Sequence, residues 1–284
     1  MKFGVAIFLT DETVDPATLG PLVEQRGFES LWVPEHSHIP ASRATPYPVG
    51  GELPREYSRT LDPFVTLATV AAVTTTLKLA TGICLVVQRD PIHTAKEVAT
   101  LDYLSGGRFL FGVGAGWNLE EMADHGTDPA RRFGLLKERV EAMKAIWTQD
   151  EAAYSGRQVA FDPMWAWPKP VQRPHPPVIV GGNGKTVLDR VLAFGDEWLP
   201  NRIGDDERIA ARIAKLRARG EAEGRGPIPT TLYGGPTKPE VLDRYEQAGV
   251  HRAVYWLPVA GADEVEAALD RYADLAGGYA RAGA

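Results

Sequence analysis

Short apolar runs and helical patterns alternate eight times along this chain of 284 residues, and this alternation restricts its possible folds most. The runs predict strands at residues 2–9, 29–34, 77–86, 108–114, 177–182, 196–200, 228–234 and 252–258. A helical pattern follows each run, near residues 16–26, 62–74, 91–105, 131–148, 184–194, 205–223, 238–248 and 262–276. Eight such units predict an α/β fold, a (β/α)8 TIM barrel formed as a single domain by residues 1–284. An open, doubly wound sheet is the alternative, but units of this number and length fit closure better.

Residues with special backbone preferences mark the ends of the predicted helices. Aspartate can cap the first amides of a helix, and proline needs no N–H at the first helical position. Such pairs precede three helices, at Asp15-Pro16, Asp62-Pro63 and Asp90-Pro91. Glycine in the left-handed conformation commonly ends a helix, and glycines stand directly before four strands. They are Gly27, Gly106 with Gly107, Gly195 and Gly249.

Two segments interrupt the alternation. Residues 36–60 are rich in Pro, Gly, Ser and Arg and form an insertion after the second strand. Residues 150–176 form another before the fifth strand and contain Trp165 and Trp167. Long loops in a compact domain are usually functional or disordered, so we expect these two to shape a substrate site. Together with Tyr47, the tryptophans suggest a flat or apolar substrate, although they could equally pack in a lid or a dimer interface.

The composition argues against several classes of partner. The net charge of -6 disfavours nucleic acid or an anionic membrane, since both require a basic surface. No apolar run is long enough to span a membrane, and the first residues form a strand pattern rather than a signal peptide. Cys84 is the single cysteine, so no intramolecular disulfide can form, and its apolar neighbours predict a buried, unreactive thiol. We therefore expect a cytoplasmic protein that acts on a small molecule.

Glu35 and His36 stand at the C-terminal end of the second predicted strand, where Pro34 stops the pairing. The chemistry of α/β barrels concentrates at that edge, and histidine changes its protonation near neutral pH. We therefore predict that His36 and Glu35 are catalytic, rather than a solvated acid and a hydrogen-bonded histidine at the start of a loop. His36 and His38 also match the His-x-His pair of metal-dependent hydrolases. The later strand ends offer neither further histidines nor a final acid, so no metal site is predicted.

Glycines gather at two other predicted strand ends, and one more lies inside a predicted strand. Gly112, Gly114 and Gly116, followed by Trp117, lack the spacing of a dinucleotide fingerprint and suggest a backbone that a flat or phosphorylated ligand approaches closely. Residues 180–184 repeat this pattern before a helix whose free amides could hold a phosphate. Gly82 lies inside the third strand, which indicates a bulge, a ligand pressed against the backbone, or a large neighbouring side chain.

Five stretches of the chain together resemble a known superfamily: Leu31–His36, Thr81–Ile83, Ala99–Gly116, Pro168–Gly182 and Gly195–Pro200. The chain is similar to the bacterial luciferase-like monooxygenases, and more closely to their coenzyme F420-dependent branch. The resemblance implies a barrel that holds a flavin-like ring at its C-terminal mouth, with His36 as the family histidine, and it suggests a homodimer. It also implies a non-proline cis peptide or bulge at Gly82–Ile83, which supports the ring. The expected cofactor-binding residues are Thr81, Gly82, Ile83, Gly114, Ala115, Gly116, Trp117, Gly181, Gly182 and Asn183.

Two positions depart from branches of this superfamily. Trp117 occupies the place of an acidic proton donor in the sugar-phosphate dehydrogenases, which makes that reaction doubtful. Ala115 stands where the luciferases have an arginine that contacts the flavin phosphate, which favours coenzyme F420 over FMN. The leading hypothesis is hydride transfer between F420 and an unidentified small substrate. The alternatives are an FMN-dependent monooxygenase that uses reduced flavin, and a non-catalytic flavin or deazaflavin carrier.

Overall fold

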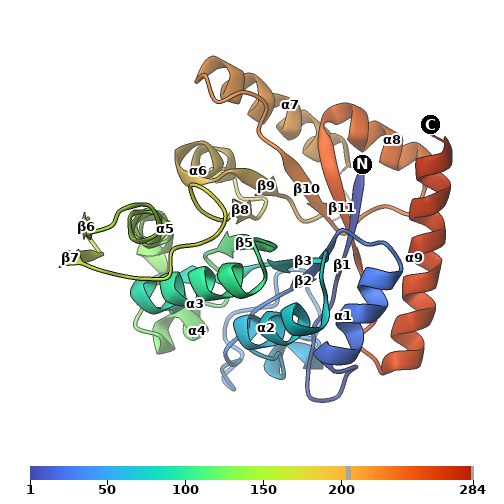
Figure 1. The fold of residues 1–284 in the computed structure, drawn as a ribbon, viewed down its shortest axis with the longest axis horizontal. Helices are drawn as coiled ribbons and strands as arrows, with labels where there is room; N and C mark the ends of the chain where they lie inside the picture. The colour runs from blue at the N-terminus through green and yellow to red at the C-terminus, as the bar shows by residue number, and fades with distance from the viewer. Residues whose placement is uncertain (203–205, 283–284) are drawn as a thin grey trace.

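Eight parallel strands close into a barrel in the computed structural model, which describes residues 1–202 and 206–282 (Figure 1). The order around the ring is β3-β2-β1-β11-β10-β9-β8-β5, and pairing of β3 with β5 closes it. The predicted TIM barrel is therefore confirmed. The barrel strands are β1 (Lys2–Ala6), β2 (Ser30–Val33), β3 (Lys78–Thr81), β5 (Phe109–Gly114), β8 (Val178–Gly181), β9 (Glu197–Leu199), β10 (Thr230–Tyr233) and β11 (Val250–Trp256).

Eight helices follow these strands at the predicted places. Asp15, Asp62 and Asp90 each cap a helix by accepting a backbone N–H, as the Asp-Pro pairs predict. Residue 205, where the sixth predicted helix begins, lies outside the described residues. The helices are α1 (Pro16–Gln25), α2 (Pro63–Val73), α3 (Pro91–Leu104), α5 (Arg132–Thr148), α6 (Val187–Phe194), α7 (Asp206–Ala222), α8 (Pro239–Ala248) and α9 (Ala262–Ala282).

Alternating side chains of the strands divide the apolar core into two layers. One buried residue from each of the eight strands packs in the barrel interior, as expected when alternate residues of a strand point to opposite sides. The larger layer lies between the strands and the helices. The interior residues are Ala6, Trp32, Ala80, Leu110, Ile179, Leu199, Tyr233 and Val254. The barrel is thus filled along its length, and a ligand site can open only at an end.

Four local features differ from the sequence prediction. The third predicted strand is divided in two rather than continuous, and it resumes as β4 (Cys84–Leu85). The break lies at the Gly82–Ile83 peptide, which is cis, so the expectation drawn from the family resemblance is confirmed. A short helix, α4 (Leu119–Asp124), follows β5. The second insertion forms an antiparallel hairpin of β6 (Ala152–Ser155) and β7 (Ala160–Met164), which extends away from the barrel at the left of Figure 1.

The fourth difference is Gly195, which ends α6 with a φ of -91°, outside the left-handed region that we predicted. A Cβ there would lie 2.6 Å from Cγ2 of Val180, so packing against β8 requires the glycine. The other predicted glycines, for example Gly27 and Gly249, do have positive φ.

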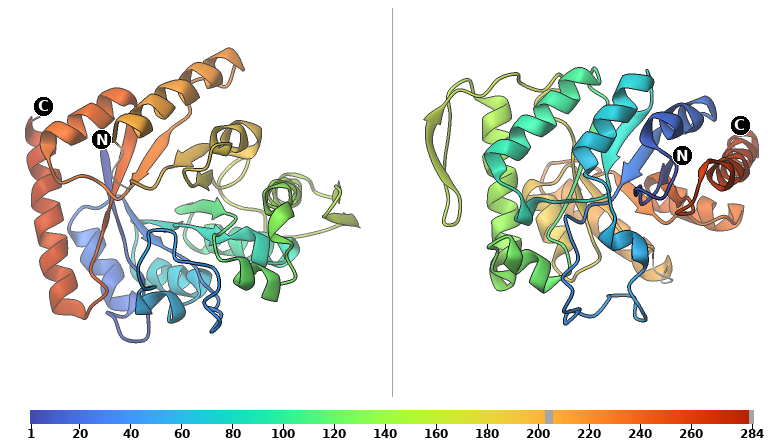
Figure 2. Two further views of the ribbon diagram at one scale, coloured as in Figure 1. Left: turned by 180° about the vertical axis from the view of Figure 1, so that it is seen from behind. Right: turned by 90° about the horizontal axis from the view of Figure 1, so that it is seen from below.

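The first insertion, residues 36–60, contains one short 3-10 helix, η1 (Arg55–Ser58). Figure 2 (right) shows it projecting beyond the barrel at the lower edge of the view. A bridge between Thr10 and Thr60 ties its end to the chain after β1. Among the described residues, no helix is long and apolar enough to cross a membrane.

Candidate active site

Two adjoining cavities open at the C-terminal end of the barrel strands. The inner cavity, of about 330 Å³, is bounded by the ends of β5, β8 and β10 and by the Gly82–Ile83 bulge. The outer cavity, of about 920 Å³, lies between the first insertion and the ends of β1 and β11. Trp117, Gly182, Gly184 and Asn201 line both. Ligands of α/β barrels bind at this end, which makes the joined cavities the candidate active site.

Most of the predicted cofactor-binding residues meet in these cavities. Asn183 lines the outer cavity and is tied to Asn201 by two hydrogen bonds, from its Nδ2 to the carbonyl O at 2.5 Å and to its Oδ1 from the backbone N at 3.2 Å. Thr81 lines neither cavity, because its buried hydroxyl donates to the carbonyl of Gly112 at 2.7 Å. The residues that line the inner cavity are Gly82, Ile83, Gly114, Ala115, Gly116, Trp117, Gly181 and Gly182.

The side chain of Ile83 explains two of the glycines around the inner cavity. It lies over the Cα atoms of Gly114 and Gly181, where a Cβ on Gly114 would overlap its Cδ1 and a Cβ on Gly181 would lie 2.7 Å from its Cγ2. A Cβ on Gly112 would likewise overlap the carbonyl O of Thr81. These glycines accommodate the bulge, which presents Ile83 as an apolar support in the cavity wall. The close approach of a ligand to this backbone, which the sequence suggested, stays a prediction.

Tyr233 is a site residue that the sequence did not reveal. It lies at the end of β10, lines the inner cavity, and has its hydroxyl 2.5 Å from where a Cβ on Gly82 would be. The hydroxyl is buried without a hydrogen-bond partner among the described residues, and burial raises its pKa well above the ordinary value. Of the possibilities left open for Gly82, a large neighbouring side chain is therefore present, together with the predicted bulge. The apolar sequence around Tyr233 gives no local signal of this role.

The outer cavity has an aromatic wall. Tyr47 and Tyr57 come from the first insertion and stand edge-on, with ring centroids 5.4 Å apart and hydroxyls 3.1 Å apart. Phe8 follows β1 and packs between Tyr57, at 4.6 Å, and Trp256 of β11, at 5.5 Å. Burial, followed by the hydrogen bond with Tyr47, raises the pKa of Tyr57, so its hydroxyl stays neutral over the physiological range.

His36 lies directly behind this wall and pairs with an acid that the sequence did not reveal. Its ring centroid is 5.2 Å from that of Tyr57 and 5.9 Å from that of Trp117. Its Nδ1 lies 2.9 and 3.1 Å from the two carboxylate oxygens of Glu121, which is fully buried on α4. Among the described residues, Nε2 has no hydrogen-bond partner, so a carboxylate orients the imidazole and leaves one nitrogen for proton exchange.

Glu35 and His36 have separate partners. Glu35 Oε2 accepts the backbone N–H of Leu85 at 2.6 Å, and its Oε1 accepts from Nε of Arg89 at 2.5 Å. Glu35 lines neither cavity. Neighbouring side chains at a strand end point to opposite sides, and the catalytic role of Glu35 stays a prediction. Glu35 braces the chain just after the bulge, so any effect on chemistry would pass through the position of that segment.

Helix α4 is attached to the first insertion by further polar pairs. His38 Nε2 lies 2.9 Å from Oδ2 of Asp124, and Ser37 Oγ lies 2.7 Å from Nε2 of His125. The Glu120 carboxylate accepts from Thr45, and this hydrogen bond is the main cause that lowers the pKa of Glu120 to about 2. Together with the His36–Glu121 pair, these contacts fix the insertion over the outer cavity. In the part of the chain that the structure describes, no three His, Cys, Asp or Glu side chains could jointly hold a metal ion.

Three arginines surround the edge of the inner cavity near Phe133. The guanidinium groups of Arg190 and Arg132 lie over the Phe133 ring at 4.2 and 4.6 Å, and Arg212 donates to the carbonyls of Asn183 and Gly184 at 2.7 and 2.8 Å. Nε of Arg132 is buried without a partner. Burial lowers the pKa of Arg190; the charge of Asp189 opposes this shift, and the charges of Arg132 and Arg212 add to it. Within residues 1–202 and 206–282, no carboxylate forms an ion pair with any of these three, so the edge is suited to an anion.

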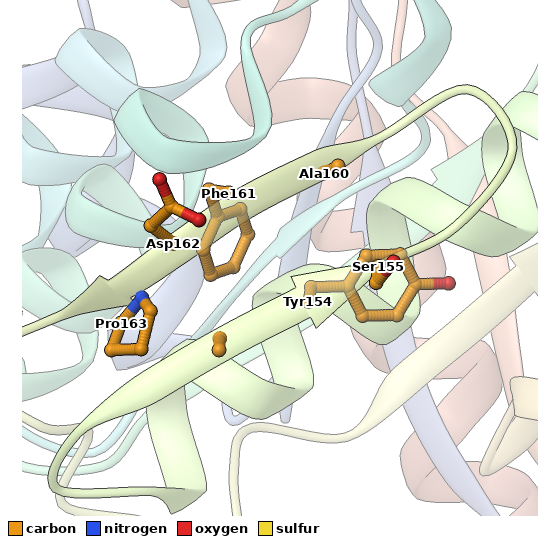
Figure 3. A pocket seen from close by; sticks show the side chains of 7 residues that line it. Tyr154, Ser155, Ala160, Phe161, Asp162 and Pro163 are labelled. Atoms are coloured by element: carbon orange, nitrogen blue, oxygen red, sulfur yellow. The ribbon is translucent and has the colours of Figure 1, made fainter.

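A separate hollow lies on the β6–β7 hairpin. Figure 3 shows its lining, with Tyr154 on one strand and Phe161 and Asp162 on the other. The two rings are 6.4 Å apart. This hollow is remote from the strand ends and contains neither a histidine nor a cluster of glycines. We therefore place the candidate active site at the barrel mouth.

A sequence profile of the luciferase-like monooxygenases matches residues 13–283. The chain belongs to this family. It is a luciferase-like oxidoreductase or monooxygenase. The uncharacterized protein Rv0953c of Mycobacterium tuberculosis is 42% identical over 281 residues, which cover 96% of this chain and 98% of that protein.

Two further comparisons concern proteins with named cofactors. The FMNH2-dependent dimethylsulfone monooxygenase of Pseudomonas putida is 33% identical over 138 residues, 48% of this chain and 38% of that enzyme. The coenzyme F420-dependent tetrahydromethanopterin reductase of Methanopyrus kandleri has the same fold, with a TM-score of 0.72, 17% identity, and coverage of 96% of this chain and 97% of that one. The proteins similar to this chain thus include enzymes named for either cofactor.

Proposed function

We propose that this chain is a coenzyme F420-dependent oxidoreductase that transfers a hydride between the deazaflavin and a small organic substrate. The observation that carries this proposal is the Ile83 bulge, seated on Gly114 and Gly181 in the inner cavity, which offers a flat ring an apolar support. When bound, the deazaflavin would supply the hydride chemistry, while the protein contributes binding, orientation and proton handling.

The choice of F420 over FMN rests on Ala115. This residue lines the inner cavity and is 6% exposed, so it offers no cation where the luciferases have an arginine for the flavin phosphate. The shared fold of the M. kandleri reductase supports the same choice. An FMN-dependent monooxygenase is the second candidate, and the similarity of half the chain to the P. putida enzyme favours it.

A phosphate of the cofactor would bind at the start of α6. The cap residue Thr186 makes no side-chain hydrogen bond to the first amides of this helix, and free amides there attract anions. Arg190, one turn further on, lines the inner cavity and makes no ion pair with the described residues. Arg132 lies across Phe133 with its buried Nε unpaired, so it can complete the site.

His36 would exchange the proton that accompanies hydride transfer. Glu121 holds Nδ1 and thereby selects the orientation in which Nε2 is the reacting nitrogen. Neither residue lines a cavity: His36 lies behind Tyr57 and Trp117, and Glu121 contacts the imidazole. Glu121 would therefore act only through His36, as a positioning residue. Glu121→Gln keeps a hydrogen-bonding side chain but loses the charge, so it should lower turnover and alter the pH profile while leaving cofactor affinity unchanged.

Calorimetric titration of the purified protein with F420 and with FMN tests the proposed cofactor. We expect micromolar binding of F420 and no FMN binding at the same concentrations. Arg190→Gln should weaken F420 binding by about tenfold, since it removes a hydrogen bond to a charged group. The control is Arg217→Gln on α7, whose side chain is 56% exposed. Micromolar FMN binding without F420 binding would favour the second candidate, an FMN-dependent monooxygenase. F420 binding without turnover of any acceptor would mean that the protein is only a deazaflavin carrier.

We also propose that the protein is a homodimer through the outer face of α2. No charged residue occurs in this helix, although Val65, Thr69, Ala72 and Val73 are exposed, with Val65 at 70%. A surface helix normally carries charged residues on its outer face, and an uncharged stripe can pair with its own copy without repulsion. Light scattering should give the mass of two chains, and Val65→Glu should give that of one. A wild-type mass of one chain would refute the dimer.

A further inference from the structure

We propose that the outer cavity binds a neutral, planar organic compound as the substrate. This inference rests on the proposed function, in which the inner cavity holds the cofactor ring. The outer cavity is the larger of the two and meets the inner one at Trp117. A compound bound in it would therefore lie against the cofactor.

The wall of the outer cavity favours flat, apolar molecules. Tyr47, Tyr57, Phe8 and Trp256 form a continuous series of rings, each within 5.5 Å of the next, and Trp117 lies 6.0 Å from Tyr47. Aromatic side chains bury large areas and prefer offset-stacked or edge-on partners. A planar ligand can make both kinds of contact here, whereas a compact polar one can make neither.

Several polar groups in this wall already have partners within the protein. The Tyr47 and Tyr57 hydroxyls bond each other at 3.1 Å, and the side-chain amide of Asn183 bonds the backbone carbonyl and backbone N–H of Asn201. Arg202, the cation in the wall, is also engaged. A carboxylate or phosphate entering the chamber would lose its water without gaining an equivalent partner, which is costly.

Glu56 strengthens the discrimination against anions. It is the acid in the wall of the outer cavity and lies next to Tyr57 in η1. Its negative charge repels an anionic ligand at the same place where the aromatic rings attract a neutral one. His36 lies behind Tyr57 and Trp117 and lines neither cavity.

Direct binding of two matched probes tests this inference without requiring turnover. The probes are 2-acetylnaphthalene, a neutral planar ketone, and 2-naphthoate, which has nearly the same shape and a negative charge. Calorimetry on the full-length protein, with and without F420, should show binding of the ketone at least tenfold tighter than that of the carboxylate. Equal or tighter binding of 2-naphthoate would overturn the proposal.

Variants at Tyr57 locate the binding and separate the ring from its hydroxyl. Tyr57→Ala should weaken ketone binding by at least tenfold, whereas Tyr57→Phe should stay within twofold, because the hydroxyl contacts Tyr47 rather than the ligand. The control is Trp165→Ala, which removes a tryptophan that is 79% exposed and lies outside the chamber lining. Unchanged ketone binding by Tyr57→Ala would refute the chamber as the binding site. If the wild-type protein binds the ketone but does not bind F420, the proposed cofactor is refuted and this inference stands.

Discussion

The two ends of the barrel differ in how their charged side chains are paired. At the N-terminal end, Arg252 is 2% exposed and donates to Glu29 at 2.7 and 2.9 Å and to Glu197 at 3.1 Å. It also donates to the hydroxyl of Thr231 at 2.7 Å, and this hydroxyl in turn bonds Glu197. At the C-terminal end, Arg132 and Arg190 make no ion pair with the described residues, and Tyr233 has a buried hydroxyl without a partner.

This difference indicates that a ligand binds at the C-terminal end. A buried polar group without a partner costs free energy, and a protein retains such groups where something else satisfies them. The charges at the N-terminal end satisfy one another, so that end contributes to folding. The C-terminal end combines unpaired donors, an apolar support and two cavities, in agreement with the general placement of barrel active sites. Mutations at the two ends should therefore affect different measurable quantities.

The largest expected effect comes from His36 at the C-terminal end. General acid–base catalysis contributes about 10²–10⁴-fold, so His36→Ala should lower turnover by about that factor. Thermal stability and cofactor affinity should change far less, because in the proposed function the bulge, α6 and the arginines hold the cofactor. Single-turnover kinetics at saturating cofactor, with calorimetry on the same variant, measure both. An unchanged single-turnover rate would end the catalytic assignment, and loss of stability alone would mean that His36 only braces the insertion.

Arg252 should give the opposite result. Arg252→Met removes the main cation of the buried Glu197 and leaves the half-buried Glu29 with Lys78, 3.3 Å away, as its nearest cation. Removal of one partner of a buried pair costs about 3–5 kcal/mol. Denaturant unfolding should show this loss, while cofactor affinity and turnover of the folded fraction stay unchanged. Arg55→Met is the control, because Arg55 pairs with Glu12 on the surface, has a side chain 70% exposed, and should cost less than about 1 kcal/mol. Strong loss of cofactor affinity in Arg252→Met would contradict the separation of the two ends.

The sequence predicts the fold of this molecule better than the side-chain contacts of its candidate active site. The strand–helix alternation and the Asp-Pro caps depend on neighbouring residues, so the barrel and most helix starts could be predicted. The position of His36 at a strand end could be predicted for the same reason. The partner of His36 could not, because Glu121 lies 85 positions away and meets it only through the placement of α4.

The glycines show a second limit of the sequence. The sequence shows where a glycine stands, but it does not show which neighbouring atom leaves no room for a Cβ at that position. Gly114 and Gly181 accommodate Ile83, and Gly195 accommodates Val180, although the sequence suggested a ligand for the first two and a left-handed turn for the third. In each case the neighbour comes from another strand. The β6–β7 hairpin was missed because its strands are short and mostly exposed, so they lack a buried apolar pattern.

A double mutant tests the interpretation of Gly114. Gly114→Ala places a Cβ against Cδ1 of Ile83, and overpacking of this kind costs about 1–3 kcal/mol. Ile83→Val removes that Cδ1, so it should restore part of the stability and of the cofactor affinity in the double mutant. Denaturant unfolding and calorimetry on the two single variants and the double variant give the coupling. If Gly114 instead admits a ligand, Gly114→Ala would weaken cofactor binding alone and Ile83→Val would not rescue it.

The smallest expected effect is the acid dependence of stability at the N-terminal end. Burial would raise the pKa of Glu29, but the hydrogen bonds and charge of Arg252 outweigh it and hold the pKa at about 2, below the ordinary 4.5. A carboxylate with a lowered pKa stabilises the fold above its unfolded value, and this stabilisation, about 2–3 kcal/mol, is lost as the pH falls from about 5 to 2. The unfolding free energy of the wild type should therefore fall over that range. In Arg252→Met, Glu29 loses the cation that lowers its pKa, so the fall should be smaller. His251 should add a separate loss of stability below about pH 6.5, because burial lowers the pKa of its imidazole. The His251→Asn variant should lack this loss. Equal acid slopes for the wild type and Arg252→Met would show that the Glu29–Arg252 pair contributes nothing to the stability of this end.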